Sequence, residues 1–212
     1  MRQFLSRWIV ALAMLLGTAS ISSASTIALD VTSPTQLFSV GAFNNVGWQF
    51  QVNSTITVDG LGLFDVGSNG LAESHQVGLW TNAGVLLASA TVSNGSTFVT
   101  SVSTAGDWLF QNITPLALAP GTYIVGGFYA TSADQVMGSV TINATPQVSF
   151  LASRASFDVG FASPGVYGLV QPGVFGPNLR FQDQAAVPEP ASLLLLGSGL
   201  AVVALRLRRK GN

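Results

Sequence analysis

His75 is the single histidine of the 212-residue chain, and it lies in DVGSNGLAESHQVGLW with Asp65 and Glu73 nearby in sequence. A histidine beside acidic side chains is the starting point for a Ser-His-Asp site or a metal site. The chain has no G-x-S-x-G turn to present a nucleophilic serine, and one histidine without cysteine does not make a zinc site. We therefore predict that His75 is a polar loop residue at the mouth of a hairpin.

The same loop has the oxygen ligands that calcium prefers. Asp65, Asn69 and Glu73 follow one another at four-residue spacing, and Gly70 allows a tight turn. The stretch does not fit the EF-hand pattern, because Gly67 stands two residues after Asp65. Two interpretations stay open: a calcium site, and a plain turn in which Asp65 and Asn69 bind nearby backbone N–H groups.

Acidic side chains do not pair along the sequence as a glycosidase needs. Such an enzyme places two carboxyl groups face to face across a cleft. The acids here are scattered singly along the chain, and most of them stand in turn-like stretches. We expect no enzyme.

Two tryptophans are candidates for stacking on a sugar ring. Trp48 shares a strand face with Val46 and Phe50, which favours a place in the core. Trp80 has the opposite parity from the apolar residues Val77 and Leu79, so we expect it to be exposed and to be the first candidate for ligand contact.

The elements that carry these residues have the pattern of short strands. In VGWQFQV apolar and small or polar residues alternate, and in TITVDGLGLF the parity shifts at Asp59-Gly60, which predicts a β-bulge. Glycine-containing turn signals separate many such runs. Residues 25–184 are therefore predicted to form an all-β domain, an antiparallel β-sandwich of jelly-roll type.

Charge is scarce and unevenly distributed. Only 8% of the residues are charged, against 48% hydrophobic. Between Ser25 and Val187 two basic residues stand against eight acidic ones, a formal charge of −6, so we expect no nucleic-acid partner. The absence of cysteine excludes disulfides and thiolate chemistry.

The first 24 residues have the three parts of a secretory signal peptide. Arg2 and Arg7 form the basic region, Trp8–Gly17 is apolar, and the small residues Ser22 and Ala24 stand at the −3 and −1 positions of a cleavage site. We predict cleavage after Ala24, with the Sec translocon and signal peptidase as partners.

The C-terminal end predicts a membrane-spanning helix at about residues 191–207. Pro190–Leu205 carries no charge and has almost no polar face. Basic residues follow, and they favour the cytoplasmic side, which would place the acidic middle of the chain outside. These flanking cations are Arg206, Arg208, Arg209 and Lys210.

The sequence Val187-Pro188-Glu189-Pro190, the leucine-rich stretch and the terminal basic cluster together resemble a PEP-CTERM sorting signal, over residues 185–212. The resemblance implies an exported bacterial protein that an exosortase recognises and processes near the Pro-Glu-Pro motif. Two prolines also resist helix, so this segment is expected to be extended.

A second stretch, at about residues 36–142, is similar to a β-sandwich domain of undefined function found in bacterial surface proteins. It begins VGWQFQVNSTITVDGLGLFDVG and ends LALAPGTYIVGGFY. This resemblance implies no catalytic residues and no required cofactor.

From these features we expect a non-enzymatic protein with a structural or adhesive role. It would pass through an inner-membrane intermediate to the cell surface or the extracellular matrix. The alternative is a carbohydrate-binding module for extracellular polysaccharide, with calcium as a conceivable stabilising ion.

Overall fold

The computed structural model describes residues 25–32, 34, 36–41, 44–138, 141–158, 160–166 and 174–183, which form strands joined by turns, with no helix among them. Ala24–Gln184 is one compact unit. The strands are β1 (Ser25–Ile27), β2 (Leu29–Val31), β3 (Gln36–Ser39), β4 (Asn44–Val52), β5 (Ile56–Val66), β6 (His75–Thr81), β7 (Leu86–Val92), β8 (Thr97–Val99), β9 (Gly106–Leu118), β10 (Gly121–Tyr129), β11 (Gln135–Gly138), β12 (Ile142–Ala144), β13 (Val148–Phe157), β14 (Val174–Phe175) and β15 (Pro177–Asp183).

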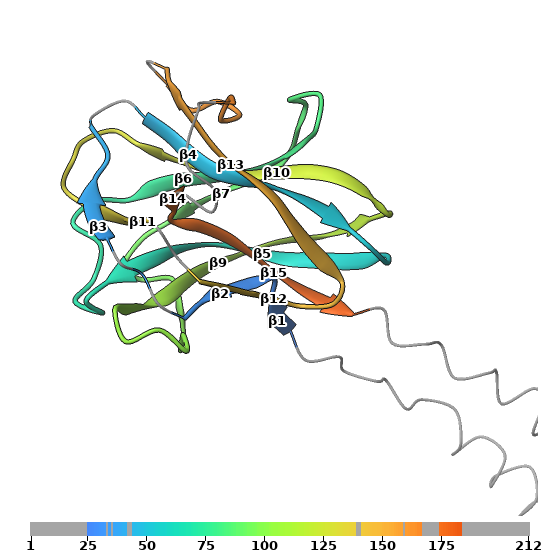
Figure 1. Cartoon of the computed structure of the whole chain (residues 1–212), viewed down its shortest axis with the longest axis horizontal. Coiled ribbons are helices and arrows are strands. Elements are labelled where there is room, and N and C mark those ends of the chain that lie inside the picture. The colour runs from blue at the N-terminus through green and yellow to red at the C-terminus, as the bar shows by residue number, and fades with distance from the viewer. Residues whose placement is uncertain are drawn as a thin grey trace, which may run out of the picture. The chain divides into compact units, whose positions relative to one another are not determined.

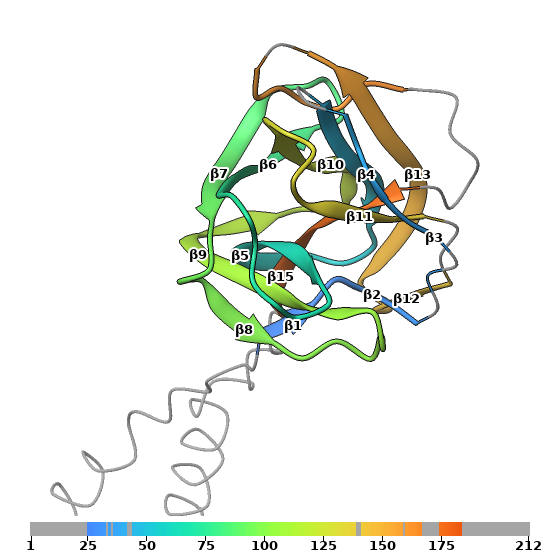
Figure 2. The same ribbon diagram turned by 90° about the vertical axis from the view of Figure 1, so that its left-hand side faces the viewer.

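Two five-stranded sheets make up most of this unit, and the paired strands in them are antiparallel. Sheet I has the order β1-β15-β5-β9-β8, and sheet II has the order β13-β4-β10-β6-β7. Figures 1 and 2 show them as two layers, with sheet II uppermost in Figure 2. The smaller sheets β14-β11-β3 and β12-β2 complete the unit. The predicted all-β, antiparallel class is confirmed.

The core lies between the two layers, and the alternation in β4 explains how it forms. Val46, Trp48, Phe50 and Val52 are all buried, as predicted, because successive side chains of a strand point to opposite faces. The Trp48 indole Nε1 donates a hydrogen bond to the Pro177 carbonyl oxygen on β15, at 2.9 Å. This bond joins sheet II to sheet I while it satisfies a buried donor.

The predicted bulge at Asp59-Gly60 is confirmed. Against β15, the pairing steps from Gly60 opposite Arg180 to Val58 opposite Phe181, so Asp59 is an extra residue on β5. The register against β9 also shifts between Val58 and Gly60. The bulge turns the carboxylate of Asp59 towards β15 and β1, where its partners lie.

Acidic residues are confined to one of the two large sheets. The strands of sheet I carry Asp59, Asp65, Asp107 and Asp183, whereas the five strands of sheet II, all of them described, contain no aspartate or glutamate. Within the described ranges there is also no helix of the length and apolar character needed to cross a membrane.

Candidate functional site

The two ends of the domain lie side by side. Strand β1 pairs antiparallel with β15, and Ser25 lies opposite Gln182. Because the strands are antiparallel, the segment before residue 25 and the segment after residue 183 join the domain at neighbouring points.

A set of polar contacts centred on Asp59 holds these two end strands. Arg180 Nε donates to Asp59 Oδ1 at 2.9 Å, and Gln182 Nε2 donates to Asp59 Oδ2 at 3.1 Å. The hydroxyl of Ser25 donates to the same carboxylate. Arg180 Nη2 also donates to Asn112 Oδ1 at 2.7 Å. Asp59 therefore binds side chains from β1 and β15 and keeps them on β5.

The prediction for His75 is wrong. His75 is not a loop residue at the mouth of a hairpin. It is the first residue of β6, and it is buried, with 1% of its surface exposed. Its Nδ1 lies 3.1 Å from the Phe128 carbonyl oxygen, its Nε2 lies 2.8 Å from Asp134 Oδ2, and its ring packs on Tyr129 at 4.6 Å between centroids. Both ring nitrogens thus bind the fold itself, and neither is turned towards a cleft.

Glu73 and Asp134 cross-link two loops. Asp134 accepts hydrogen bonds from the backbone N–H groups of Ala72 and Glu73, at 2.9 and 3.1 Å. In return, Glu73 Oε1 accepts from the backbone N–H and the hydroxyl of Thr131, each at 3.0 Å. The two carboxylates hold the 71–74 loop against the 131–134 loop.

The other two residues of the predicted calcium site, Asp65 and Asn69, bind backbone groups close to them in sequence. Asp65 is 5% exposed, and its Oδ2 accepts from the Gly70 N–H at 2.8 Å, which is the contact expected of a plain turn. The side-chain amide nitrogen of Asn69 donates to the carbonyl oxygens of Gly70 and Val66, each at 3.3 Å. The described part of the chain has no group of three or more His, Asp or Glu side chains placed to hold a metal ion. Calcium binding stays a prediction.

The predicted exposure of Trp80 is wrong, although its parity is right. The indole lies on the outward side of sheet II, but it is 3% exposed because Phe161 covers it, at 5.2 Å between ring centroids. A Cβ added at Gly78 or Gly126 would lie 2.4 or 3.3 Å from the Trp80 ring. These glycines leave room for the indole to lie flat on the sheet. Trp80 is therefore not available as a sugar-stacking surface in this structure.

Asp30 is a buried polar centre that the sequence analysis did not single out. Its Oδ1 accepts from the Ser101 hydroxyl at 2.5 Å and from Trp108 Nε1 at 3.0 Å. The backbone N–H groups of Val31 and Val102 donate to its two oxygens, each at 2.8 Å. The partners lie up to 78 residues away in sequence, so no local pattern indicated this site.

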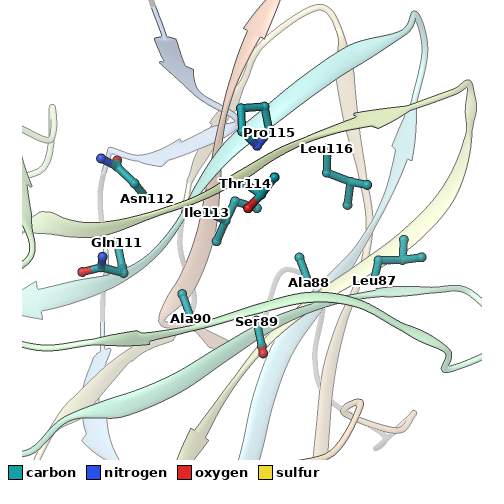
Figure 3. A pocket seen from close by; sticks show the side chains of 10 residues that line it. All are labelled: Leu87, Ala88, Ser89, Ala90, Gln111, Asn112, Ile113, Thr114, Pro115 and Leu116. Atoms are coloured by element: carbon teal, nitrogen blue, oxygen red, sulfur yellow. The ribbon is translucent and has the colours of Figure 1, made fainter.

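A groove of about 520 Å³ opens between the unpaired edges of β7 and β9. Strand β8 pairs only with Trp108–Phe110, so the part of β9 that follows has a free edge on that side, and β7 is the last strand of sheet II. Figure 3 shows the side chains that line the groove. They include no charged and no aromatic residue: Leu87, Ala88, Ser89, Ala90, Gln111, Asn112, Ile113, Thr114, Pro115 and Leu116. This lining offers no acid–base pair for catalysis.

The remaining predictions fall on parts of the chain outside the described residues. They are the signal peptide with Ser22 and Ala24, the sorting motif Val187–Pro190, the membrane helix, and the terminal cations.

Family comparisons account for both parts of the chain. Residues 186–210 match the PEP-CTERM protein-sorting motif, and residues 31–167 match a domain of unknown function, DUF4082. The second match extends further along the chain than the resemblance at residues 36–142. No curated protein and no solved structure matches the chain. The chain therefore belongs to the DUF4082 family and carries a PEP-CTERM motif, the signal of an exported protein that an exosortase processes at the membrane.

Proposed function

We propose that the mature protein is a non-enzymatic component of the cell surface or the extracellular matrix, with a structural or adhesive role. The observation that carries this proposal is the match of residues 186–210 to the sorting motif, directly after the last strand of the domain. Before processing, the chain would be an inner-membrane intermediate, anchored by the predicted helix at about residues 191–207.

The use of the ionisable side chains supports a non-enzymatic role. The carboxylates of Asp30, Asp59 and Asp134 each bind two or more donors of the domain itself. The single histidine binds Phe128 and Asp134. Groups that are saturated by such contacts stabilise a fold and are poorly placed to exchange protons with a substrate.

The architecture supports export as a free-standing domain. A jelly-roll-like β-sandwich with its own core needs no cysteine, and the bond between Trp48 and Pro177 joins its two layers. The pairing of Ser25 with Gln182 brings the first and the last strand of the domain together. Cleavage on both sides would then release the domain without breaking its sheets.

The sorting step is tested by replacing the motif in the native host. In the variant Pro188→Ala/Glu189→Ala/Pro190→Ala we expect the chain to stay in the membrane fraction at its unprocessed mass. The matched control is Asp158→Ala, which also removes one acidic residue and leaves the motif intact, and we expect it to be processed like the wild type. The proposal is contradicted if the motif variant reaches the surface fraction with the same mass as the wild type.

A further inference from the structure

The two arginines of the exported domain are in opposite situations. Arg180 is fully engaged: it binds Asp59 at 2.9 Å and Asn112 at 2.7 Å, and its guanidinium lies 5.7 Å from the centre of the Phe110 ring. Arg154 has a buried Nε with no hydrogen-bond partner in the described part of the chain. Among the described residues, the carboxylates in close contact with a basic side chain are Asp134, beside His75, and Asp59, beside Arg180, and neither contacts Arg154.

The register of β13 against β4 shows on which face Arg154 lies. Ser153 is opposite Trp48, and both are buried between the sheets. Arg154 is opposite Gly47, one residue further, and it therefore stands on the outward face of sheet II. Gly47 has no side chain, and a Cβ there would lie 2.0 Å from the Val125 carbonyl oxygen, so β4 and β10 approach closely beside this position.

The outward face of sheet II next to Arg154 is polar and free of acids. Gln49 and Gln51 follow Gly47 on the same face of β4, and both are partly exposed. Gln49 Nε2 donates to Asn82 Oδ1 at 2.6 Å, and the Thr122 hydroxyl donates to Gln51 Oε1 at 3.0 Å. These amides and hydroxyls are the groups with which proteins bind the hydroxyls of a sugar chain.

The other ionisable groups near β13 do not neutralise Arg154. Asp158 follows the strand and accepts from the Ser156 hydroxyl at 2.5 Å, without an ion pair to Arg154. His75, on β6 of the same sheet, is paired with Asp134. The domain has a formal charge of −6 and two arginines. Arg180 is paired with Asp59, and Arg154, on this face, has no counter-charge among the described residues.

The charge of Arg154 has no counter-charge among the described residues, and an acceptor that carries a negative charge would pair with it. Burial lowers the pKa of Arg154 from its ordinary value, which is the expected effect of removing water from a charge without supplying a partner. A carboxylate is the best-matched acceptor, because its two oxygens fit the planar fork of donors. A neutral sugar chain supplies no such charge.

We propose that the outward face of sheet II binds an acidic polysaccharide, with Arg154 as the contact to a sugar carboxylate. The neighbouring Gln49, whose Nε2 binds Asn82, offers its amide oxygen to a hydroxyl group of the same chain. This inference rests on the proposed function at the cell surface or in the matrix, and it names the class of polymer that the protein holds there.

Binding is measured by isothermal titration calorimetry with the full chain in a neutral detergent, using polygalacturonate as the acidic probe and dextran of equal length as the neutral one. We expect polygalacturonate to bind and dextran not to bind, with an affinity that falls as salt rises. Arg154→Gln is expected to weaken binding by about tenfold or more, and Arg154→Lys by less, because lysine keeps the charge and loses the fork. The matched control Gln111→Glu makes the same change in net charge on the other sheet, and we expect less than about a twofold effect.

The inference is overturned if Arg154→Gln binds as the wild type does, if Gln111→Glu weakens binding equally, or if dextran binds as well as polygalacturonate. Competition by inorganic phosphate at the same concentration of anionic groups would show a general anion site and also overturn it. Thermal unfolding of Arg154→Gln shows whether that variant is folded, and Gln49→Ala gives a second test that keeps the arginine. The sorting-motif variant reports separately on the proposed function, since it leaves sheet II unchanged.

Discussion

Ser25 lies directly opposite Gln182 in the antiparallel pair β1–β15, and the side chains of both bind the carboxylate of Asp59. The N-terminal strand and the C-terminal strand of the domain are therefore held by one acidic group on a β-bulge of β5. This contact explains how a chain that is expected to be cut at both ends keeps its end strands in place. It also makes the ends of the domain part of its structure, where many domains have loose termini.

Replacing Asp30 by alanine is expected to destabilise the domain strongly. The change leaves the buried Trp108 Nε1, the Ser101 hydroxyl and two backbone N–H groups without their acceptor. We expect the free energy of unfolding to fall by about 3–5 kcal/mol. Urea unfolding measures it, with Asp158→Ala as the control for loss of an exposed acid, expected to change stability by less than about 0.5 kcal/mol. A loss below about 1 kcal/mol for Asp30→Ala would show that this carboxylate does not hold the segment at Ser101 and Val102 in place.

The hydroxyl of Tyr129 is buried and has no hydrogen-bond partner among the described residues, so Tyr129→Phe should not destabilise the domain at neutral pH. Burial, and then the charge of Asp134, raise the pKa of Tyr129 well above its ordinary value. A raised pKa in the folded state means that the folded domain keeps a proton that the unfolded chain loses above about pH 10, so stability falls as pH rises beyond that point. Phenylalanine has no such proton, and we expect the variant to lose less stability between about pH 9 and pH 11. Urea unfolding at both pH values tests this, and an equal alkaline loss in the two proteins would contradict it.

His75 and Asp134 are expected to be energetically coupled, because they form a close and largely buried pair at 2.8 Å. A double-mutant cycle with His75→Gln and Asp134→Asn should give a coupling energy of about 1–3 kcal/mol. The pair His75→Gln and Asp158→Asn serves as the control, because Asp158 binds Ser156 and the His75 ring binds Phe128 and Asp134. This cycle should be additive within about 0.5 kcal/mol. Additive effects in the first cycle would mean that Asp134 acts only through the backbone of the 71–74 loop.

Trp80→Ala is expected to destabilise the domain rather than to remove a ligand contact. The indole fills the space above Gly78 and Gly126 and packs on Phe161, so its removal opens a cavity of aromatic size. The expected loss is about 3–5 kcal/mol in the free energy of unfolding. Phe98→Ala is the matched control, because that ring is 57% exposed, and its effect should be much smaller. Unchanged thermal stability of Trp80→Ala would return Trp80 to the list of candidate contact residues.

Local patterns in the sequence predict the strands of this domain well, and its polar sites poorly. The buried face of β4 follows from the alternation around Trp48, and the bulge follows from the parity shift at Asp59, since both depend on neighbouring residues only. Trp80 is buried because Phe161, on a loop far along the chain, packs on it. The alternation within a strand predicts on which face a residue lies, but not which distant residue covers that face. His75 likewise finds Asp134 at a separation of 59 residues. Contacts of this kind depend on how loops pack on finished sheets, which one sequence does not reveal.

Mass spectrometry of the mature protein from its native host tests the central claim most directly, because it reads both ends of the chain at once. We predict a chain that begins at Ser25 and no longer carries the residues beyond the Pro188-Glu189-Pro190 segment. Full-length chain in the soluble cytoplasmic fraction, still beginning at Met1 and ending at Asn212, would contradict export and processing together.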